Sequence, residues 1–205
     1  SGTFNDIDVP PTLVSFAVDI AGSGDIVTPE LKAAGHRLVL FEIERDDFDI
    51  PVYDEVSALY EQIHGLAQEG IIAAAYALDA RGLAAALSKM AFGNGLGVEI
   101  DGSLPVSGLF GNGLGDIVAE VPADRIGELE AGEISYTTVG TVTKQPQIVY
   151  GDMSLSLREA LEAWTERLEK VFPTRAARGR EVVQSGLYRA ERVYVCKNKV
   201  AKPTV

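Results

Sequence analysis

The sequence of 205 residues has little of the chemistry on which covalent catalysis and metal centres usually depend. It contains one cysteine, Cys196, and two histidines, His36 and His64. A single cysteine excludes an internal disulfide, and the two histidines lie far apart in the chain with no cysteine near them. We therefore expect an ordinary thiol and no catalytic histidine, and we assign no catalytic residue to this chain.

Long apolar runs are also absent. No stretch approaches the roughly 18–20 uninterrupted apolar residues of a membrane-spanning helix, and the chain does not begin with a basic segment followed by an apolar one. These absences predict a cytoplasmic protein without a membrane partner. The sequence opens with Ser1-Gly2 instead of a methionine, from which we expect a piece of a longer polypeptide.

Basic residues are scarce except near the end of the chain. The formal net charge is −12, yet residues 175–205 carry eight lysines and arginines against two glutamates. The preceding part therefore holds a charge of −18 and would repel the phosphates of a nucleic acid, which excludes that class of partner. The basic segment predicts either contact with an acidic neighbouring surface or a solvated linker.

Strands and helices are predicted to alternate along the chain. The expected strands are Thr12–Ile20, Arg37–Glu44, Ile71–Ala77, Asp116–Val121 and Tyr136–Thr143, and the expected helices are Tyr53–Gln68, Leu83–Phe92, Ala123–Glu130 and Leu155–Val171. This order predicts an α/β layered sandwich with a mixed β-sheet flanked by helices. Because Pro173 ends the last helix, we expect one domain over residues 1–172 and a linker or docking segment over residues 173–205.

The hexapeptide Phe-Gly-Asn-Gly-Leu-Gly occurs twice, at residues 92–97 and 110–115. The first copy ends an expected helix and the second precedes an expected strand, so we interpret the duplication as shared turn chemistry. The stretches Leu87–Asn94 and Leu109–Val121 resemble the C-terminal domain of phosphoribosylformylglycinamidine synthase (formylglycinamide ribonucleotide amidotransferase). The resemblance is to the large single-chain type, in the aminoimidazole ribonucleotide synthetase-like superfamily.

The resemblance implies a fold like that of the C-terminal domain of aminoimidazole ribonucleotide synthetase. It also implies a place in a purine-biosynthetic ligase that converts formylglycinamide ribonucleotide, ATP and glutamine to formylglycinamidine ribonucleotide. The partners would be the other domains of the same polypeptide, namely the first synthetase half and a glutaminase following residue 205. ATP or ADP with Mg would belong to the full-length enzyme, and this chain alone is expected to be inactive and to bind neither.

In the family, the loop before the helix reads His-Asp-x-Ser-Asp-Gly-Gly and holds Mg and a phosphate. The corresponding segment here is Tyr76–Gly82, in which Ala77 replaces the magnesium-binding Asp and Asp79 replaces the phosphate-binding Ser. Two interpretations stay open. Asp79 can hold a cation while Arg81 and the Gly82 amide hold a phosphate, or the site is degenerate and the two charged side chains cap the helix and face water.

A second family motif, Leu-Phe-Gly-Glu-x-x-Gly-Arg, corresponds to Leu109–Asp116, where both charged positions have changed. Three glycines can cradle an anion with backbone N–H groups, but Asp116 beside them opposes this, and the alternative is a structural turn. For the whole chain, the resemblance favours a scaffold domain with a degenerate auxiliary nucleotide site. The alternatives are a stand-alone ATP-binding member of the superfamily and an acidic protein-interaction module.

Overall fold

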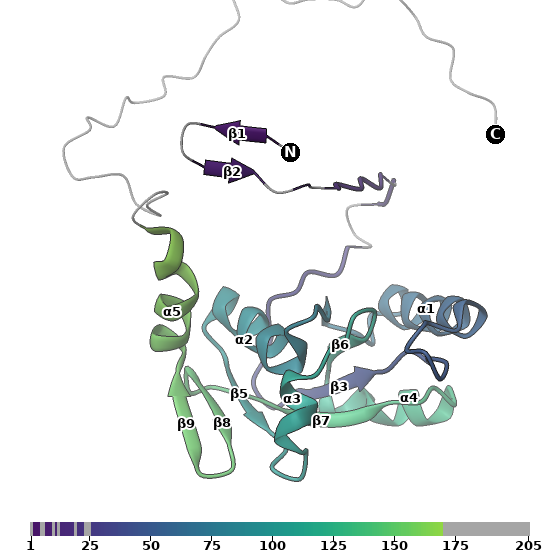
Figure 1. The fold of residues 1–205 in the computed structure, drawn as a ribbon. Helices are drawn as coiled ribbons and strands as arrows, with labels where there is room; N and C mark the ends of the chain where they lie inside the picture. The colour runs from purple at the N-terminus through teal and green to yellow at the C-terminus, as the bar shows by residue number, and fades with distance from the viewer. Residues whose placement is uncertain are drawn as a thin grey trace, which may run out of the picture. The chain divides into compact units, whose positions relative to one another are not determined.

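The computed structural model describes residues 2–4, 7–9, 11, 13–18, 20–22 and 26–169. Contacts divide the chain into two units, Ser1–Thr165 and Glu166–Val205. The first unit contains a seven-stranded sheet with helices on both of its faces (Figure 1). The predicted α/β sandwich with a mixed sheet is thus confirmed.

The strands of the sheet follow the spatial order β4-β6-β3-β7-β5-β8-β9. Their bounds are β3 Arg37–Phe41, β4 Ala74–Ala77, β5 Gly97–Ile100, β6 Ile117–Val121, β7 Thr137–Thr143, β8 Gln147–Tyr150 and β9 Met153–Ser156. All neighbouring strands run antiparallel except β5 and β8, which are parallel. A separate antiparallel pair joins β1 (Gly2–Phe4) to β2 (Ile7–Val9).

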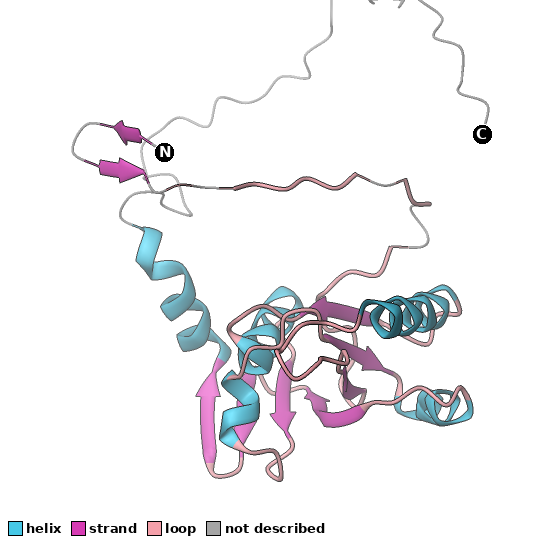
Figure 2. Ribbon diagram, turned by 45° about the vertical axis from the view of Figure 1, so that its right-hand side comes forward, coloured by secondary structure: helices cyan, strands magenta, loops and turns pink. Residues whose placement is uncertain are grey.

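Two groups of helices cover the two faces of the sheet, as Figure 2 shows in cyan. Their bounds are α1 Tyr53–Gln68, α2 Gly82–Asn94, α3 Val106–Phe110, α4 Ile126–Ala131 and α5 Leu157–Glu169, with a 3-10 turn at Ala123–Arg125. Helices α1 and α4 lie on one face, and α2 and α3 lie on the other. Among the described residues, no helix is long and apolar enough to cross a membrane.

The core has two halves because successive side chains of a strand point to opposite faces. In β3, Leu38 packs on the α2 side, whereas Val39 and Phe41 pack on the side of α1 and α4. All three are fully buried. The three- and four-residue spacing that predicts α1 places Ile63 in the second half of the core, and the predicted bounds of this helix are confirmed.

The strand expected at Thr12–Ile20 is wrong in the part of it that the structure describes. Residues 13–18 and 20 belong to no strand, and the side chains of Val14, Phe16 and Val18 are 60%, 87% and 95% exposed. Alternating apolar residues indicate which face of a strand is buried, but a strand also needs a neighbour that pairs with its backbone. None of the described strands pairs with residues 13–18.

The last predicted helix begins two residues later than expected. Leu155 pairs with Ile148 in the β8–β9 hairpin, so α5 starts at Leu157. Ser156 caps the helix, because its hydroxyl accepts a hydrogen bond from the Glu159 N–H at 3.2 Å. The predicted end of this helix at Val171, the boundary at residues 172 and 173, and the expected linker or docking segment lie outside the described residues.

A buried carboxylate fixes the connector that leads into β3. Glu120 on β6 is fully buried, and its two oxygens accept hydrogen bonds from the N–H groups of Lys32 at 2.7 Å and Ala33 at 3.0 Å. The Nδ1 atom of His36 lies 2.7 Å from the same carboxylate, at the distance of an ion pair but without the direction of a hydrogen bond. The Glu120 carboxylate is therefore a buried anchor of this connector, beside the backbone bonds of Leu31 to Met90 and of Gly35 to Val142.

We expect Glu120→Gln to lower the free energy of unfolding by about 1–3 kcal/mol, because an amide offers one acceptor oxygen where two N–H groups now find acceptors. Urea denaturation measures the change. The matched control is Glu130→Gln on the exposed surface of α4, which should shift stability by no more than about 0.5 kcal/mol. Equal stability of the two variants would show that Glu120 does not anchor the connector.

Candidate functional site in the loop between β4 and α2

The loop that resembles the family's nucleotide motif joins the edge strand β4 to the start of α2. Ala77 ends β4 with its side chain exposed, and Leu78 then turns into the core. The N–H of Leu78 donates to the carbonyl of Asp116 at 2.8 Å, which holds the loop against the end of β6. The structure thus brings Asp79, Arg81 and Gly82 together at the N-terminus of α2.

The carboxylate of Asp79 is held by donors of its own loop and helix. Its Oδ1 accepts the backbone N–H of Arg81 at 2.8 Å, and its Oδ2 lies 3.1 Å from the ammonium of Lys89. The Nε of Arg81 is 3.7 Å from Oδ2, and the carbonyl of Asp79 accepts the Gly82 N–H at 3.0 Å. A negative charge at the N-terminus of a helix is also favoured by the helix dipole.

These contacts change the titration of both charged partners. The N–H of Arg81, and then the Lys89 ammonium, hold the pKa of Asp79 below its usual range. The hydroxyl of Tyr76, 3.0 Å from the Lys89 Nζ, and then Asp79 raise the pKa of Lys89. The Lys89 side chain is only 15% exposed. A metal ion placed on Asp79 would therefore lie beside a fixed positive charge, which repels it.

Gly82 permits the closest approach in the site. Its φ is +76°, and a Cβ built on it would lie 2.5 Å from the Gly111 carbonyl oxygen and 2.9 Å from that of Leu109. Only glycine fits this conformation and this space. The two stretches of sequence that resemble family motifs, separated by about 30 residues, are therefore packed directly on each other.

The glycine-rich segment after α3 is a turn that uses two of its backbone donors internally. The N–H of Asp116 donates to the Gly113 carbonyl at 2.9 Å, and that of Leu114 donates to the side chain of Asn112 at 3.2 Å. The Asp116 carboxylate accepts the Ile43 N–H at 3.0 Å, while burial raises the pKa of this carboxyl group. This geometry favours the structural turn over an anion cradle.

Residues that could complete a metal site are not gathered near the loop. Among the described residues, no three histidine, cysteine, aspartate or glutamate side chains are placed to share an ion. His36 lies beside Glu120, and His64 is exposed on α1. Trp164 stacks on Phe92 with ring centroids 5.7 Å apart, so it packs α5 against α2.

No family model matches the chain. Phosphoribosylformylglycinamidine synthase II of Thermotoga maritima superposes with a TM-score of 0.55 and 15% identity, over 66% of this chain and 27% of that one. PurLQS from the same organism gives a TM-score of 0.56 at 14% identity, over 67% and 28%. The chain shares the fold of this part of the synthase.

A third solved structure, T. maritima PurL complexed with ATP, gives a TM-score of 0.53 at 16% identity, over 67% of this chain and 27% of that one. At such identities the likeness establishes the fold. The chain spans little more than a quarter of the length of these neighbours. The ligands and the reactions of those whole proteins are therefore not established for this chain by the shared fold.

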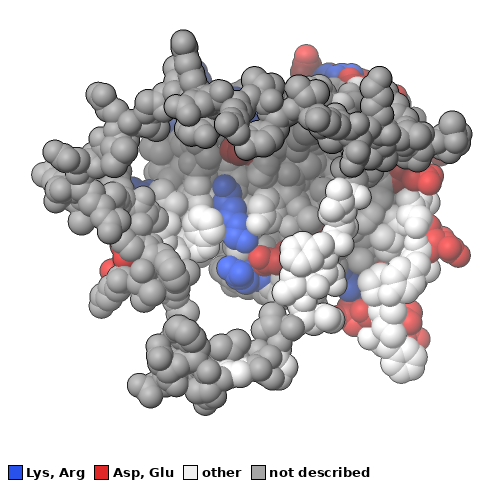
Figure 3. All heavy atoms as spheres, turned by 90° about the horizontal axis from the view of Figure 1, so that it is seen from above, with Lys and Arg blue, Asp and Glu red and all other residues white. Residues whose placement is uncertain are grey.

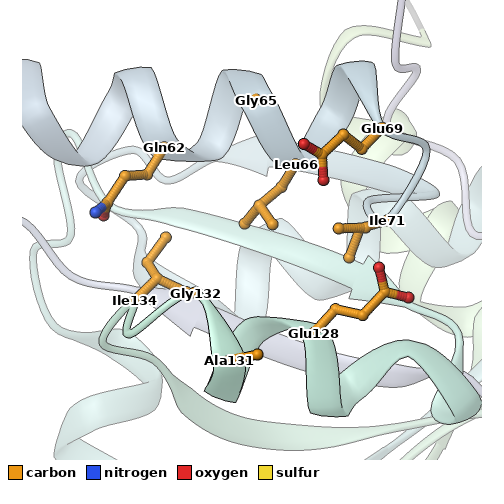
Figure 4. Close-up of a pocket in the computed structure, with 9 residues that line it drawn as sticks. All are labelled: Gln62, Gly65, Leu66, Glu69, Ile71, Glu128, Ala131, Gly132 and Ile134. Carbon is orange, nitrogen blue, oxygen red and sulfur yellow. The ribbon is translucent and has the colours of Figure 1, made fainter.

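Sequence reasoning missed a hollow of about 450 Å³ between α1 and α4 (Figure 4). Leu66 and Ile71 extend toward it, and Glu128 stands on its α4 wall. Arg125 already forms two hydrogen bonds to the Glu128 carboxylate, at 2.6 and 2.8 Å, and one to the Glu69 carbonyl at 3.1 Å. The Glu128 carboxylate on this wall is thus already paired with Arg125.

Acidic side chains gather on the side of the molecule that carries α1 and α4, at the right of Figure 3. Helix α1 contributes Asp54, Glu55 and Glu61, and α4 contributes Glu128 and Glu130. The β4–α2 loop instead has one carboxylate, Asp79, beside its own Arg81 and the Lys89 of α2. The loop is therefore the less acidic part of an acidic domain.

We expect Gly82→Ala to lower the free energy of unfolding by about 2–5 kcal/mol, because alanine is strained at this φ and its Cβ would overlap the Gly111 carbonyl. Chemical denaturation measures the loss. Gly65→Ala on α1 is the matched control, since a Cβ there meets nothing within 4 Å and should stabilise the helix by about 0.5–1 kcal/mol. Similar effects at the two positions would refute the proposed close contact.

We expect Lys89→Met to raise the pKa of Asp79 while leaving it below the usual range, because the Arg81 N–H makes the larger contribution. A carboxylate with a lowered folded pKa stabilises the fold above its unfolded pKa, and this contribution disappears as the pH falls through the folded value. Side-chain carbon NMR over acidic pH follows the titration. Asp101 is the internal control, since the Ser103 N–H lowers its pKa in the same way without Lys89. An unchanged Asp79 titration would contradict the pairing.

Proposed function

We propose that this chain is the C-terminal domain of the second synthetase half in a large single-chain phosphoribosylformylglycinamidine synthase. Its parent would convert formylglycinamide ribonucleotide, ATP and glutamine to formylglycinamidine ribonucleotide. The motifs at Leu87–Asn94 and Leu109–Val121 support the family, and the shared fold supports the superfamily. In this proposal the domain acts as scaffold and contacts the other domains of its polypeptide.

The observation that carries the scaffold role is the contact set of Asp79. A nucleotide-binding loop must keep N–H donors at the helix start available for a phosphate. Here the Asp79 carboxylate accepts the Arg81 N–H at 2.8 Å, and the Asp79 carbonyl accepts the Gly82 N–H. The aspartate that stands where the family has serine thus acts as an internal anion, and a phosphate would have to displace it.

The part of the auxiliary site that would hold Mg²⁺ is weakened for a reason separate from the loss of phosphate donors. Mg²⁺ prefers carboxylate and phosphate oxygens in octahedral geometry. Ala77 supplies no such oxygen, and the nearest carboxylate, Asp79, is paired with Lys89 at 3.1 Å. If ADP with Mg were to bind, Asp79 would hold the ion and Arg81 with the Gly82 amide would hold the phosphate. That arrangement requires the existing contacts of Asp79 to break.

We expect the unaltered chain to bind ADP with Mg more weakly than about 1 mM, an interaction of no more than about 4 kcal/mol. The double variant Ala77→Asp/Asp79→Ser restores the carboxylate and the hydroxyl and should bind more tightly. Isothermal titration compares the two proteins. Micromolar binding by the unaltered chain would refute the degenerate site.

The matched control for this titration is Asp101→Ser. Asp101 also accepts a backbone N–H two residues ahead, from Ser103 at 2.8 Å, but it lies outside the β4–α2 loop. This variant should bind ADP with Mg as weakly as the unaltered chain. A gain equal to that of the double variant would mean that removal of any carboxylate, and not repair of the loop, improves binding.

The role in the parent enzyme calls for a test on the full-length polypeptide. We expect the parent to form formylglycinamidine ribonucleotide from its three substrates, and Asp79→Asn to leave the rate within about two-fold, because the loop holds no reacting group. The isolated chain should release neither phosphate from ATP nor ammonia from glutamine. A parent without this amidation activity would overturn the assignment, and a strong loss in the Asp79 variant would overturn the scaffold role alone.

A further inference from the structure

A second hollow, of about 690 Å³, opens on the α2 side of the sheet. Strands β8 and β9 form its floor with Ile148 and Leu155, and α3 contributes Val106 and Phe110 to one wall. We call this hollow the α2–α3 groove. It lies beside the last hairpin, on which Met153 and Leu155 are exposed.

The surface of the α2–α3 groove is apolar and open to solvent. Phe110, Val106 and Leu155 are 65%, 54% and 45% exposed. On the opposite wall, α2 presents the small side chains of Ala84 and Ala85, which leaves room beside the floor. Exposed apolar surface that is contiguous and concave is typical of ligand sites.

Polar groups of the groove are already satisfied, with one exception. The hydroxyl of Ser88 donates to the Ala84 carbonyl at 2.7 Å, and that of Tyr150 donates to the Leu104 carbonyl at 2.5 Å. The charged residue of the lining is Arg81. Its guanidinium is 67% exposed and its described ion-pair partner, Asp79, is 3.7 Å away. A guanidinium with free N–H groups at the rim selects an anion and suits a carboxylate in particular.

We propose that the α2–α3 groove binds a small apolar carboxylate. The carboxylate pairs with Arg81 at the rim, and the apolar body lies on Ile148 and Leu155 between the two helices. The charge complementarity at Arg81 and the apolar floor carry this assignment. It goes beyond the proposed synthase role and does not depend on it, because it assigns neither a nucleotide nor a reacting substrate to the groove. Arg81 is the residue that the groove shares with the β4–α2 loop, through its ion pair with Asp79.

The test uses dodecanoate at concentrations where it is monomeric, with dodecyltrimethylammonium as the probe of opposite charge. Methyl NMR should show dodecanoate shifting the signals of Val106, Ile148 and Leu155. The methyl signals of Leu66 and Ile134, which line the hollow between α1 and α4, should not move. Shifts confined to that other hollow, or no shifts at all, would overturn the proposal and leave the groove as a face for a protein segment.

Two variants separate charge recognition from general apolar binding. Arg81→Gln should weaken dodecanoate about ten-fold, the loss expected for a hydrogen-bonded ion pair, and should leave dodecyltrimethylammonium unchanged. Ala85→Trp, which fills the groove, should abolish the groove shifts. Arg37→Gln makes the same charge change on β3 and should have no effect. Equal affinity of dodecanoate for the unaltered protein and Arg81→Gln would overturn the assignment of a carboxylate ligand.

Discussion

The lack of a side chain at Gly82 is the constraint on which the site depends. At φ +76° its backbone lies where a Cβ would overlap the Gly111 carbonyl, so the start of α2 rests directly on the end of α3. This contact sets the direction of α2, which packs Leu87 and Met90 into the core. It also sets the position of the loop before the helix, with Asp79 turned toward Lys89. Gly82 thus fixes the backbone of this loop whatever side chains its neighbours carry.

Asp79 gives that loop a different electrostatic state from the one that the family's motif implies. The helix N-terminus, the Arg81 N–H and the Lys89 ammonium all attract an anion, and a carboxylate of the chain already supplies one. The Arg81 N–H and then Lys89 lower the pKa of Asp79, while the Tyr76 hydroxyl and then Asp79 raise the pKa of Lys89. Arg81 is held less closely by this pair, and its guanidinium lies at the rim of the α2–α3 groove. Arg81 therefore places a cation beside an apolar surface.

Much of the fold could be predicted because local pattern and burial agree. The bounds of α1 follow from apolar spacing, since Ile63 and its neighbours face one half of the core. The sequence pattern alone failed where backbone pairing between strands decides the secondary structure. Val14, Phe16 and Val18 alternate as in a strand, but no described strand lies beside them. Leu155 continues the apolar spacing of a helix, but its backbone pairs with Ile148 in a hairpin. The loop residues Asp79, Arg81 and Gly82 could be found through a motif. The Lys89–Tyr76 contact, the buried Glu120 and the groove could not, because they join residues that only the tertiary structure brings together.

The Asp79 carboxylate accepts the Arg81 backbone N–H, a donor that a bound phosphate would need. The NMR signal of this amide therefore tests the central claim directly. The Arg81 N–H signal can be followed by proton–nitrogen NMR while the pH is lowered through the titration of Asp79. The account predicts that the amide proton moves upfield as the carboxylate is protonated and that Asp79→Ser removes this transition. An Arg81 amide that is insensitive both to acid and to the substitution would contradict the account, because the donor would then be free.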